Sequence, residues 1–123
     1  MRLESVIYLL SGGTLGVLLR LIIVKKIDYK FGLTINNIST VNLISSLLVG
    51  IYIALNIISN NILLFFLIGF LGCFSTFSSF IFHLFILLKE QKYSQFIQHY
   101  IEILIYSTLM VFLGYFTTKI IFN

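Results

Sequence analysis

Long hydrophobic runs separated by short polar stretches dominate this chain. Four such runs can be recognised, at about residues 3–24, 35–58, 62–88 and 96–121. About 20 apolar residues are enough to cross a bilayer as a helix, so each run predicts one transmembrane span. The expected fold is therefore an all-α membrane protein in which residues 1–123 form a single domain of four transmembrane helices.

The third run is unusual at its centre. Residues 62–88 contain no Lys, Arg, Asp or Glu, and 27 residues are more than one straight span requires. Gly69 and Gly72 are three apart, and Ser and Thr residues then alternate with phenylalanines. These residues form helices poorly, and the chain has no proline that could break a helix instead. We therefore predict a third helix broken at the membrane centre, because irregular backbone at that depth survives only where it lines a cavity or binds an ion.

Small and polar residues in the first two runs indicate helix packing and a polar path. Gly12 and Gly16 are four apart, and Gly50 follows Ser46 at the same spacing, which lets helix backbones approach closely in lipid. Asn42 lies about 10 Å inside the second span, where an amide without a partner would cost several kcal/mol. The pattern leaves two readings of Asn42 open, a pore donor or a structural hydrogen-bond anchor.

Composition narrows the class of protein. Hydrophobic residues make up 59% of the chain and charged residues 10%, so a water-facing surface could not be covered. The net charge of +4 comes from basic residues at the ends of the spans, where they meet lipid headgroups, and we expect no nucleic-acid partner. The single cysteine, Cys73, allows neither an internal disulfide frame nor a cysteine metal cluster. No nucleotide motif or catalytic triad is recognisable, so we expect no enzyme.

The distribution of charge predicts a preferred orientation. With four spans, Arg2 and Lys119 lie on one side of the membrane, and six basic residues lie on the other: Arg20, Lys25, Lys26, Lys30, Lys89 and Lys92. This bias would favour an orientation with both termini outside. His99 and Glu102, near the start of the fourth span, are expected at the membrane interface.

Three blocks of the sequence resemble the Fluc (CrcB) family of fluoride channels. The third block is the most specific, because few other families carry it inside a membrane span. Together with the four-span plan, the likeness covers essentially the whole chain. The blocks are Gly12-Gly13-Thr14-Leu15-Gly16 through Arg20, Val41-Asn42 with Gly50, and Gly69-Phe70-Leu71-Gly72 through Phe77-Ser78-Ser79-Phe80.

The resemblance implies an assembly and a bound ion. The family plan is a dual-topology dimer of two antiparallel subunits, with two fluoride pores and a structural sodium ion (Na+) at the interface. By this likeness, Gly72 and Ser75 would give main-chain carbonyls to the sodium. Because a homodimer that inserts both ways up needs nearly balanced charge, the bias described above keeps a heterodimer with a paralogous subunit open beside a homodimer.

The resemblance also assigns the residues of the pore. Phe77 and Phe80 would be the pore phenylalanines and Asn42 the polar pore residue of the second span. The hydroxyl groups beside them would be those of three further residues: Thr76, Ser78 and Ser79. Arg20 matches a basic residue at the end of the first span, which would act at the vestibule or as a topology anchor.

One departure from the family pattern concerns the pore mouth. His83 lies where many members carry an acidic residue just beyond the second pore phenylalanine. A carboxylate that helps at the pore mouth is therefore replaced here, and a histidine could make conduction pH-dependent.

The expected function is passive, fluoride-selective export of cytoplasmic fluoride down its electrochemical gradient, which would give fluoride resistance to a bacterial cell through its plasma (inner) membrane. One alternative is a proton-coupled exporter of the small multidrug-resistance type, which needs a membrane-embedded carboxylate in the first span. Glu4 lies only at the edge of that span, and Glu102 is in the fourth. Another alternative is a non-conducting partner subunit of a heterodimeric fluoride channel.

Overall fold

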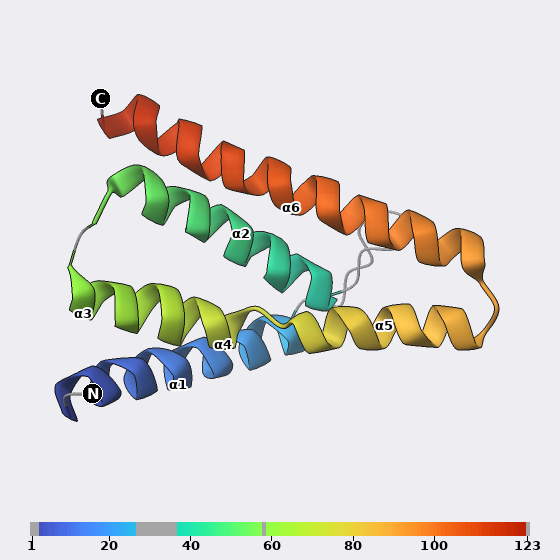
Figure 1. The fold of residues 1–123 in the computed structure, drawn as a ribbon, viewed down its shortest axis with the longest axis horizontal. Helices are drawn as coiled ribbons and strands as arrows, with labels where there is room; N and C mark the ends of the chain where they lie inside the picture. Colours follow the sequence, from blue (N-terminus) through green and yellow to red (C-terminus); the bar gives the residue numbers. More distant parts are fainter. Residues whose placement is uncertain (1–2, 27–36, 58, 123) are drawn as a thin grey trace.

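The hydrophobic runs form helices that lie side by side (Figure 1). The computed structural model describes residues 3–26, 37–57 and 59–122, and these contain helices but no strands. The helices, in chain order, are α1 (Leu3–Lys26), α2 (Asn37–Leu55), α3 (Asn60–Ile62), the π-helix η1 (Leu63–Leu71), α4 (Gly72–Phe74), α5 (Phe77–Lys89) and α6 (Tyr93–Phe122). The third hydrophobic run thus comprises α3, η1, α4 and α5.

Length and composition make this an all-helical membrane protein. Three segments are long and apolar enough to cross a membrane: Leu3–Lys26, Asn60–Lys89 and Tyr93–Phe122. The second hydrophobic run contains a shorter apolar helix, Ser39–Leu55, whose 17 residues extend about 25 Å. Large hydrophobic side chains cover the outside of the described helices, as expected for surfaces that face lipid.

The observed helix bounds differ from the predicted spans by a few residues. The second run was expected to reach residue 58, whereas α2 ends at Leu55. Asn56 then has a φ of 49°, the left-handed conformation with which helices commonly end. The third and fourth segments begin two and three residues earlier than expected, at Asn60 and Tyr93. The expected start of the second span, residue 35, lies outside the described residues.

Two helix pairs are in close contact, α2 with α6 and α1 with η1. A Cβ atom built on Gly50 would collide with the carbonyl of Val111, so α2 and α6 touch there through their backbones. On the other pair, Gly12 lies against the carbonyl of Phe65 and Gly16 against that of Phe70. Small residues allow the helix backbones to approach this closely. In lipid no hydrophobic effect drives helices together, so the dispersion contacts made at such short distances stabilise the pairs.

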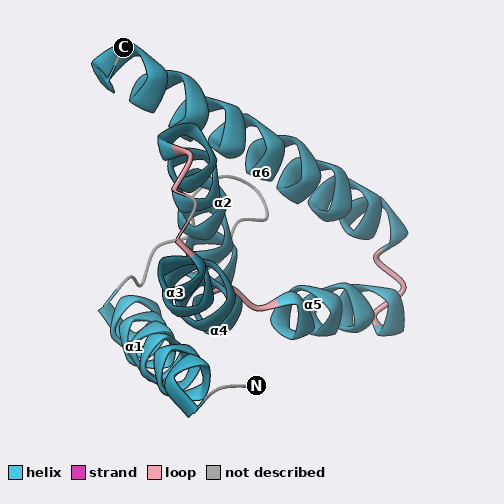
Figure 2. Cartoon of the chain, turned by 60° about the vertical axis from the view of Figure 1, so that its left-hand side comes forward, coloured by secondary structure: helices cyan, strands magenta, loops and turns pink. Residues whose placement is uncertain are grey.

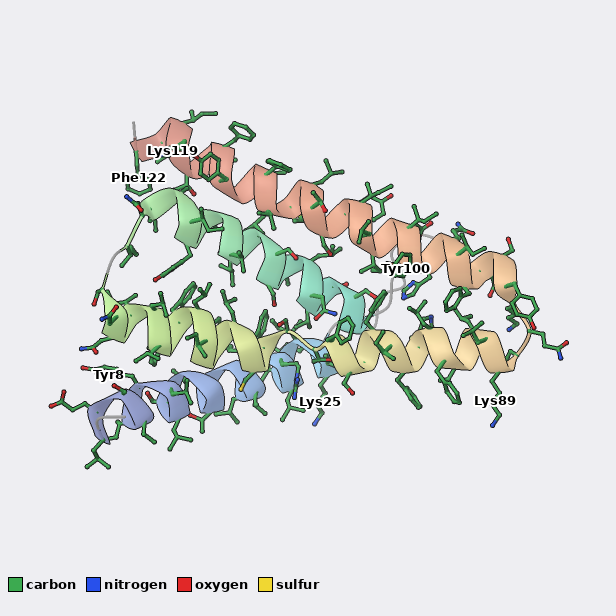
Figure 3. The ribbon with its side chains drawn as sticks, in the orientation of Figure 1. Tyr8, Lys25, Lys89, Tyr100, Lys119 and Phe122 are labelled. Atoms are coloured by element: carbon green, nitrogen blue, oxygen red, sulfur yellow. The ribbon has the colours of Figure 1, made fainter. Side chains whose placement is uncertain are left out.

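The ends of the segments alternate between two sides. In Figure 1 the N-terminus, α3 and the C-terminus lie at one end, and Figure 3 places Lys119 at that end and Lys25 and Lys89 away from it. In the turn after α5, Lys92 pairs with Glu90 at 2.7 Å, and this hydrogen bond lowers the pKa of the exposed Glu90 carboxyl below its usual value.

Candidate functional site

The third segment is interrupted near its middle. Helix α4 ends at Phe74, and α5 begins at Phe77. Between them, Ser75 (φ −75°, ψ 155°) and Thr76 (φ −140°, ψ 111°) have extended backbone. Figure 2 shows the linker between α4 and α5, with α5 running in a different direction from α3 and α4. The break that the glycine and hydroxyl pattern indicates therefore falls on these two residues.

Asn42 of α2 binds the backbone of this break. Its side-chain Oδ1 accepts a hydrogen bond from the Thr76 N–H at 2.9 Å, and its Nδ2 donates to the Thr76 carbonyl at 3.2 Å. Both backbone groups of an extended residue are thereby satisfied in a segment where water is scarce. An amide NH₂ group carries two hydrogens, and the Thr76 carbonyl takes one of them. Asn42 thus makes the hydrogen bonds of a structural anchor. Its second amide hydrogen is still available to donate to an ion in a pore.

The hydroxyl of Thr76 caps the next helix. Its Oγ1 accepts a hydrogen bond from the N–H of Ser79 at 3.2 Å. A Thr in extended conformation before a helix commonly makes this bond, because the first N–H groups of a helix have no intrahelical partner. The local sequence Thr76-Phe77-Ser78-Ser79 thus starts α5 as soon as the chain leaves the break.

The two carbonyls suggested for sodium have lost their helical donors. In a continuous helix the Thr76 N–H would donate to the Gly72 carbonyl, and the Ser79 N–H to the Ser75 carbonyl. Here those two N–H groups donate to Asn42 and to the Thr76 hydroxyl instead. Gly72 is exposed, and no atom lies within 4 Å of a Cβ built on it. The chemistry of this donor set, main-chain oxygens on an open face, fits a hard cation such as sodium.

Two cavities lie against the start of α5. One, of about 400 Å³, is lined by Arg20, Leu21, Val24, Val41, Thr76, Ser78 and Ser79. The other, of about 370 Å³, is lined by Ser39, Asn42, Ser78, Ser79, Phe80, Phe82, His83, Ile86 and His99. Ser78 and Ser79 belong to both. The half-buried Arg20 therefore faces the same hydroxyl residues that Asn42 approaches from the other cavity.

The two phenylalanines suggested for the pore differ in their surroundings. The rings of Phe77 and Phe80 have centroids 6.2 Å apart and planes inclined at 49°. Phe80 is half-buried, with its centroid 5.8 Å from that of His99 and 6.3 Å from that of Tyr100. Phe77 is 74% exposed in the single chain. Phe80 thus lines the second cavity, whereas Phe77 points away from the described helices.

Comparison with known proteins identifies the family. The family model described as "CrcB-like protein, Camphor Resistance (CrcB)" matches residues 7–118. The chain is 45% identical over 121 residues to "Fluoride-specific ion channel FluC 2" of Prochlorococcus marinus (strain MIT 9312), which covers 98% of this chain and 99% of the relative. The chain belongs to the CrcB family.

Two further relatives are similar. A protein of the same printed name from Prochlorococcus marinus subsp. pastoris (strain CCMP1986 / NIES-2087 / MED4) is 45% identical over 128 residues, all of both chains. "Fluoride-specific ion channel FluC" of Prochlorococcus marinus (strain MIT 9301) is 33% identical over 90 residues, which are 72% of this chain and 81% of the relative. The likeness to members of the CrcB family therefore extends over the whole sequence.

The fold of this CrcB-family chain also brings to the site residues that the sequence did not assign to it. His99 was expected at the membrane interface, but it is only 1% exposed and touches His83 and Phe80. Its burial depends on α5 folding back beside α6, and a helical pattern within α6 gives no sign of this. Tyr100 and Ser39 reach the same region. Thr108 of α6 donates to the Leu104 carbonyl of its own helix.

Proposed function

We propose that this protein is a fluoride-selective channel that lets cytoplasmic fluoride leave a bacterial cell passively. The observation that carries the proposal is the broken third segment, whose hydroxyl residues Ser78 and Ser79 line cavities on both sides of α5. The relatives are named fluoride-specific ion channels, which agrees with this proposal. The cell membrane is the expected location, since the chain has several apolar helices.

The lining of the two cavities suits a small, strongly hydrated anion. Such an anion gives up its water only if donors replace it, and the hydroxyls of Ser78 and Ser79 and the second amide hydrogen of Asn42 are neutral donors. Arg20 adds a positive charge in the first cavity that attracts anions from solution. In this proposal fluoride passes from Arg20 along the hydroxyls to Asn42.

Phenylalanine rings can assist in the second cavity. A ring edge carries the positive end of the aromatic quadrupole, so Phe80 offered edge-on stabilises an anion without holding it strongly. Phe77 has the same chemistry but is largely exposed in one chain, so its part in a pore requires a second subunit to cover it.

Transport in this proposal needs no energy source other than the membrane potential. A potential of about 100 mV, negative inside, favours outward movement of a monovalent anion by about 2.3 kcal/mol, which is roughly fifty-fold. We therefore propose a channel and no enzymatic step.

A sodium ion would complete the break. Gly72 and Ser75 would hold it through their main-chain carbonyls, whose helical donors are engaged elsewhere. When bound, the ion supplies a fixed positive charge between two anion paths. One chain offers two of these carbonyls, so we propose that an antiparallel second subunit brings the other two.

The identity of the second subunit depends on charge. Of the six basic residues counted on the far side, Arg20, which lines a cavity, contributes least to orientation, and five against two still favours one orientation. A paralogue with the opposite bias would make a heterodimer, and two relatives are named FluC 2. The homodimer remains the simpler assembly, and in a heterodimer this chain could be the non-conducting partner.

The structure does not favour the alternative of a multidrug-type exporter. That mechanism needs a carboxylate within the first span, whereas Glu4 is exposed at the first turn of α1.

The deciding experiment is fluoride efflux from liposomes that contain only this chain, followed with a fluoride electrode and with chloride efflux as the matched control. We expect fluoride release far above that of empty liposomes and little chloride release. Equal fluxes of the two anions would refute a fluoride-selective channel. No fluoride flux alone, but flux after co-reconstitution with a paralogue, would select the heterodimer over the homodimer.

A further inference from the structure

The chain contains two histidines, and they touch each other. His83 lies on α5 and His99 on α6, and their ring centroids are 4.6 Å apart with planes inclined at 64°. His99 is 1% exposed and His83 is half-buried. Two imidazoles from different helices thus meet at one place, which nothing in the local sequence of either helix requires.

The pair lies on the wall of the second cavity. That cavity, of about 370 Å³, also contains Asn42 and Phe80, and the Phe80 and His99 centroids are 5.8 Å apart. A ligand held by the two imidazoles would therefore occupy space that fluoride crosses in the proposed pathway.

The spacing of the rings suits one shared metal ion. Imidazole nitrogen is a good ligand for zinc, copper and nickel, at about 2.0–2.1 Å for zinc. Two imidazoles bound in plane to one ion at this distance have centroids about 4.5 Å apart when the angle at the metal is 90°, and about 5.2 Å apart at the tetrahedral angle. The observed 4.6 Å therefore fits the 90° angle of a square-planar or octahedral ion such as Cu²⁺ or Ni²⁺ and is short for tetrahedral zinc.

The rest of the coordination shell would be water. Among the described residues, no third His, Cys, Asp or Glu side chain joins the pair in a group that could hold a metal ion, so water would fill the remaining positions. The cavity is large enough for several water molecules. Such a site binds its ion reversibly, unlike a closed structural site with four protein ligands.

We propose that His83 and His99 form a site for a borderline transition-metal dication, such as Ni²⁺ or Cu²⁺, and that the bound ion closes the fluoride path. The ion obstructs the cavity beside Phe80, and its double positive charge holds fluoride there instead of passing it on. The metal site stands on the geometry of the two rings alone, whereas closure of the path rests on the proposed function.

The binding test uses Cu²⁺ and the purified full chain in detergent after removal of any affinity tag. Electron paramagnetic resonance should show one bound Cu²⁺ per chain with hyperfine lines from two nitrogens. His83→Gln should reduce this pattern to one nitrogen or abolish binding, and His83→Cys, which keeps a metal ligand, should retain Ni²⁺ binding. Phe85→Ile, on the exposed side of the same helix, is the matched control and should bind like the parent.

The flux test uses the same variants in liposomes. We expect the divalent ions to inhibit fluoride efflux in the order of their affinity for nitrogen ligands, Co²⁺ below Ni²⁺ below Cu²⁺, with recovery after a chelator is added. Mg²⁺, which prefers oxygen ligands, should not inhibit at the same concentration and controls for charge alone. In His83→Gln, the flux measured without metal is the reference, and the divalent ions should no longer reduce it.

Each result has a definite meaning. Absence of Cu²⁺ binding to the parent, or an unchanged two-nitrogen spectrum in His83→Gln, overturns the metal site and leaves the rings as a packed aromatic pair. A two-nitrogen spectrum with unaffected fluoride flux supports the site and overturns closure. If the chain conducts no fluoride at all, the spectrum still decides the site, so the two proposals fail separately.

Discussion

The side-chain amide of Asn42 holds both the N–H and the carbonyl of Thr76, at 2.9 Å and 3.2 Å. One residue of α2 thereby satisfies the interrupted backbone of the third segment. In a continuous helix the Thr76 N–H would donate to the Gly72 carbonyl. Because Asn42 accepts this hydrogen bond instead, the Gly72 carbonyl loses its helical donor. The same two hydrogen bonds stabilise the break and leave a main-chain oxygen available for a cation.

Replacement of Asn42 should therefore affect stability and transport together. Asn42→Ala removes two hydrogen bonds and leaves two backbone groups without partners, at a cost of about 2–4 kcal/mol. We expect a lower unfolding midpoint in detergent and at least about a tenfold loss of fluoride efflux, which is about 1.4 kcal/mol in the barrier. The control is Ser46→Ala, because Ser46 donates only to the Asn42 carbonyl within its own helix. Parent-like flux from Asn42→Ala would remove the residue from the pathway.

The glycines of the helix contacts should tolerate no side chain. In Gly50→Ala the new Cβ meets the Val111 carbonyl, so α2 and α6 must separate, at about 1–3 kcal/mol. Thermal unfolding of the purified protein measures this loss. Ile53→Ala, at an exposed position of the same helix, is the control. If both variants unfold at the same temperature, the contact between α2 and α6 is not as close as described.

Phe80 should matter for transport, whereas an exposed phenylalanine on the same helix should not. Phe80→Ile removes the ring edge that lines the second cavity but keeps much of the volume, so the fold should persist while fluoride efflux falls by about tenfold or more. Phe85 is 59% exposed on α5, and Phe85→Ile should conduct like the parent. Efflux rates from liposomes, compared at equal protein content, test this pair. Equal loss in both variants would indicate a general effect on helix packing.

Arg20 should raise the local concentration of anions in the first cavity. Arg20→Gln should increase the fluoride concentration that gives half-maximal flux by about three- to tenfold, which is about 0.7–1.4 kcal/mol. Arg20→Lys keeps the charge and should stay closer to the parent. The dependence of flux on ionic strength should also weaken in Arg20→Gln, because salt screens charge attraction. Lys119→Gln, in the last turn of α6, is the control, and a matching shift there would argue against a specific role of Arg20.

Much of the fold follows from the sequence because it depends on local properties. The length of the apolar runs predicts the helical segments, and Gly69, Gly72 and the hydroxyl residues indicate where the third segment stops being helical. The helix ends were displaced by up to three residues, because caps such as Asn56 depend on backbone conformation rather than on hydrophobicity.

The site needed the tertiary structure where its contacts join residues far apart in the chain. The amide of Asn42 was recognisable as costly in lipid, but only the packing of α2 beside the break shows that its partner is Thr76. The burial of His99 against His83 likewise depends on the pairing of α5 with α6. The sequence by itself determined where helices form and where one breaks, since turns of a helix depend on residues a few positions apart. Which polar groups meet across helices was decided only by the way the helices pack, because such contacts form between residues that no local pattern connects.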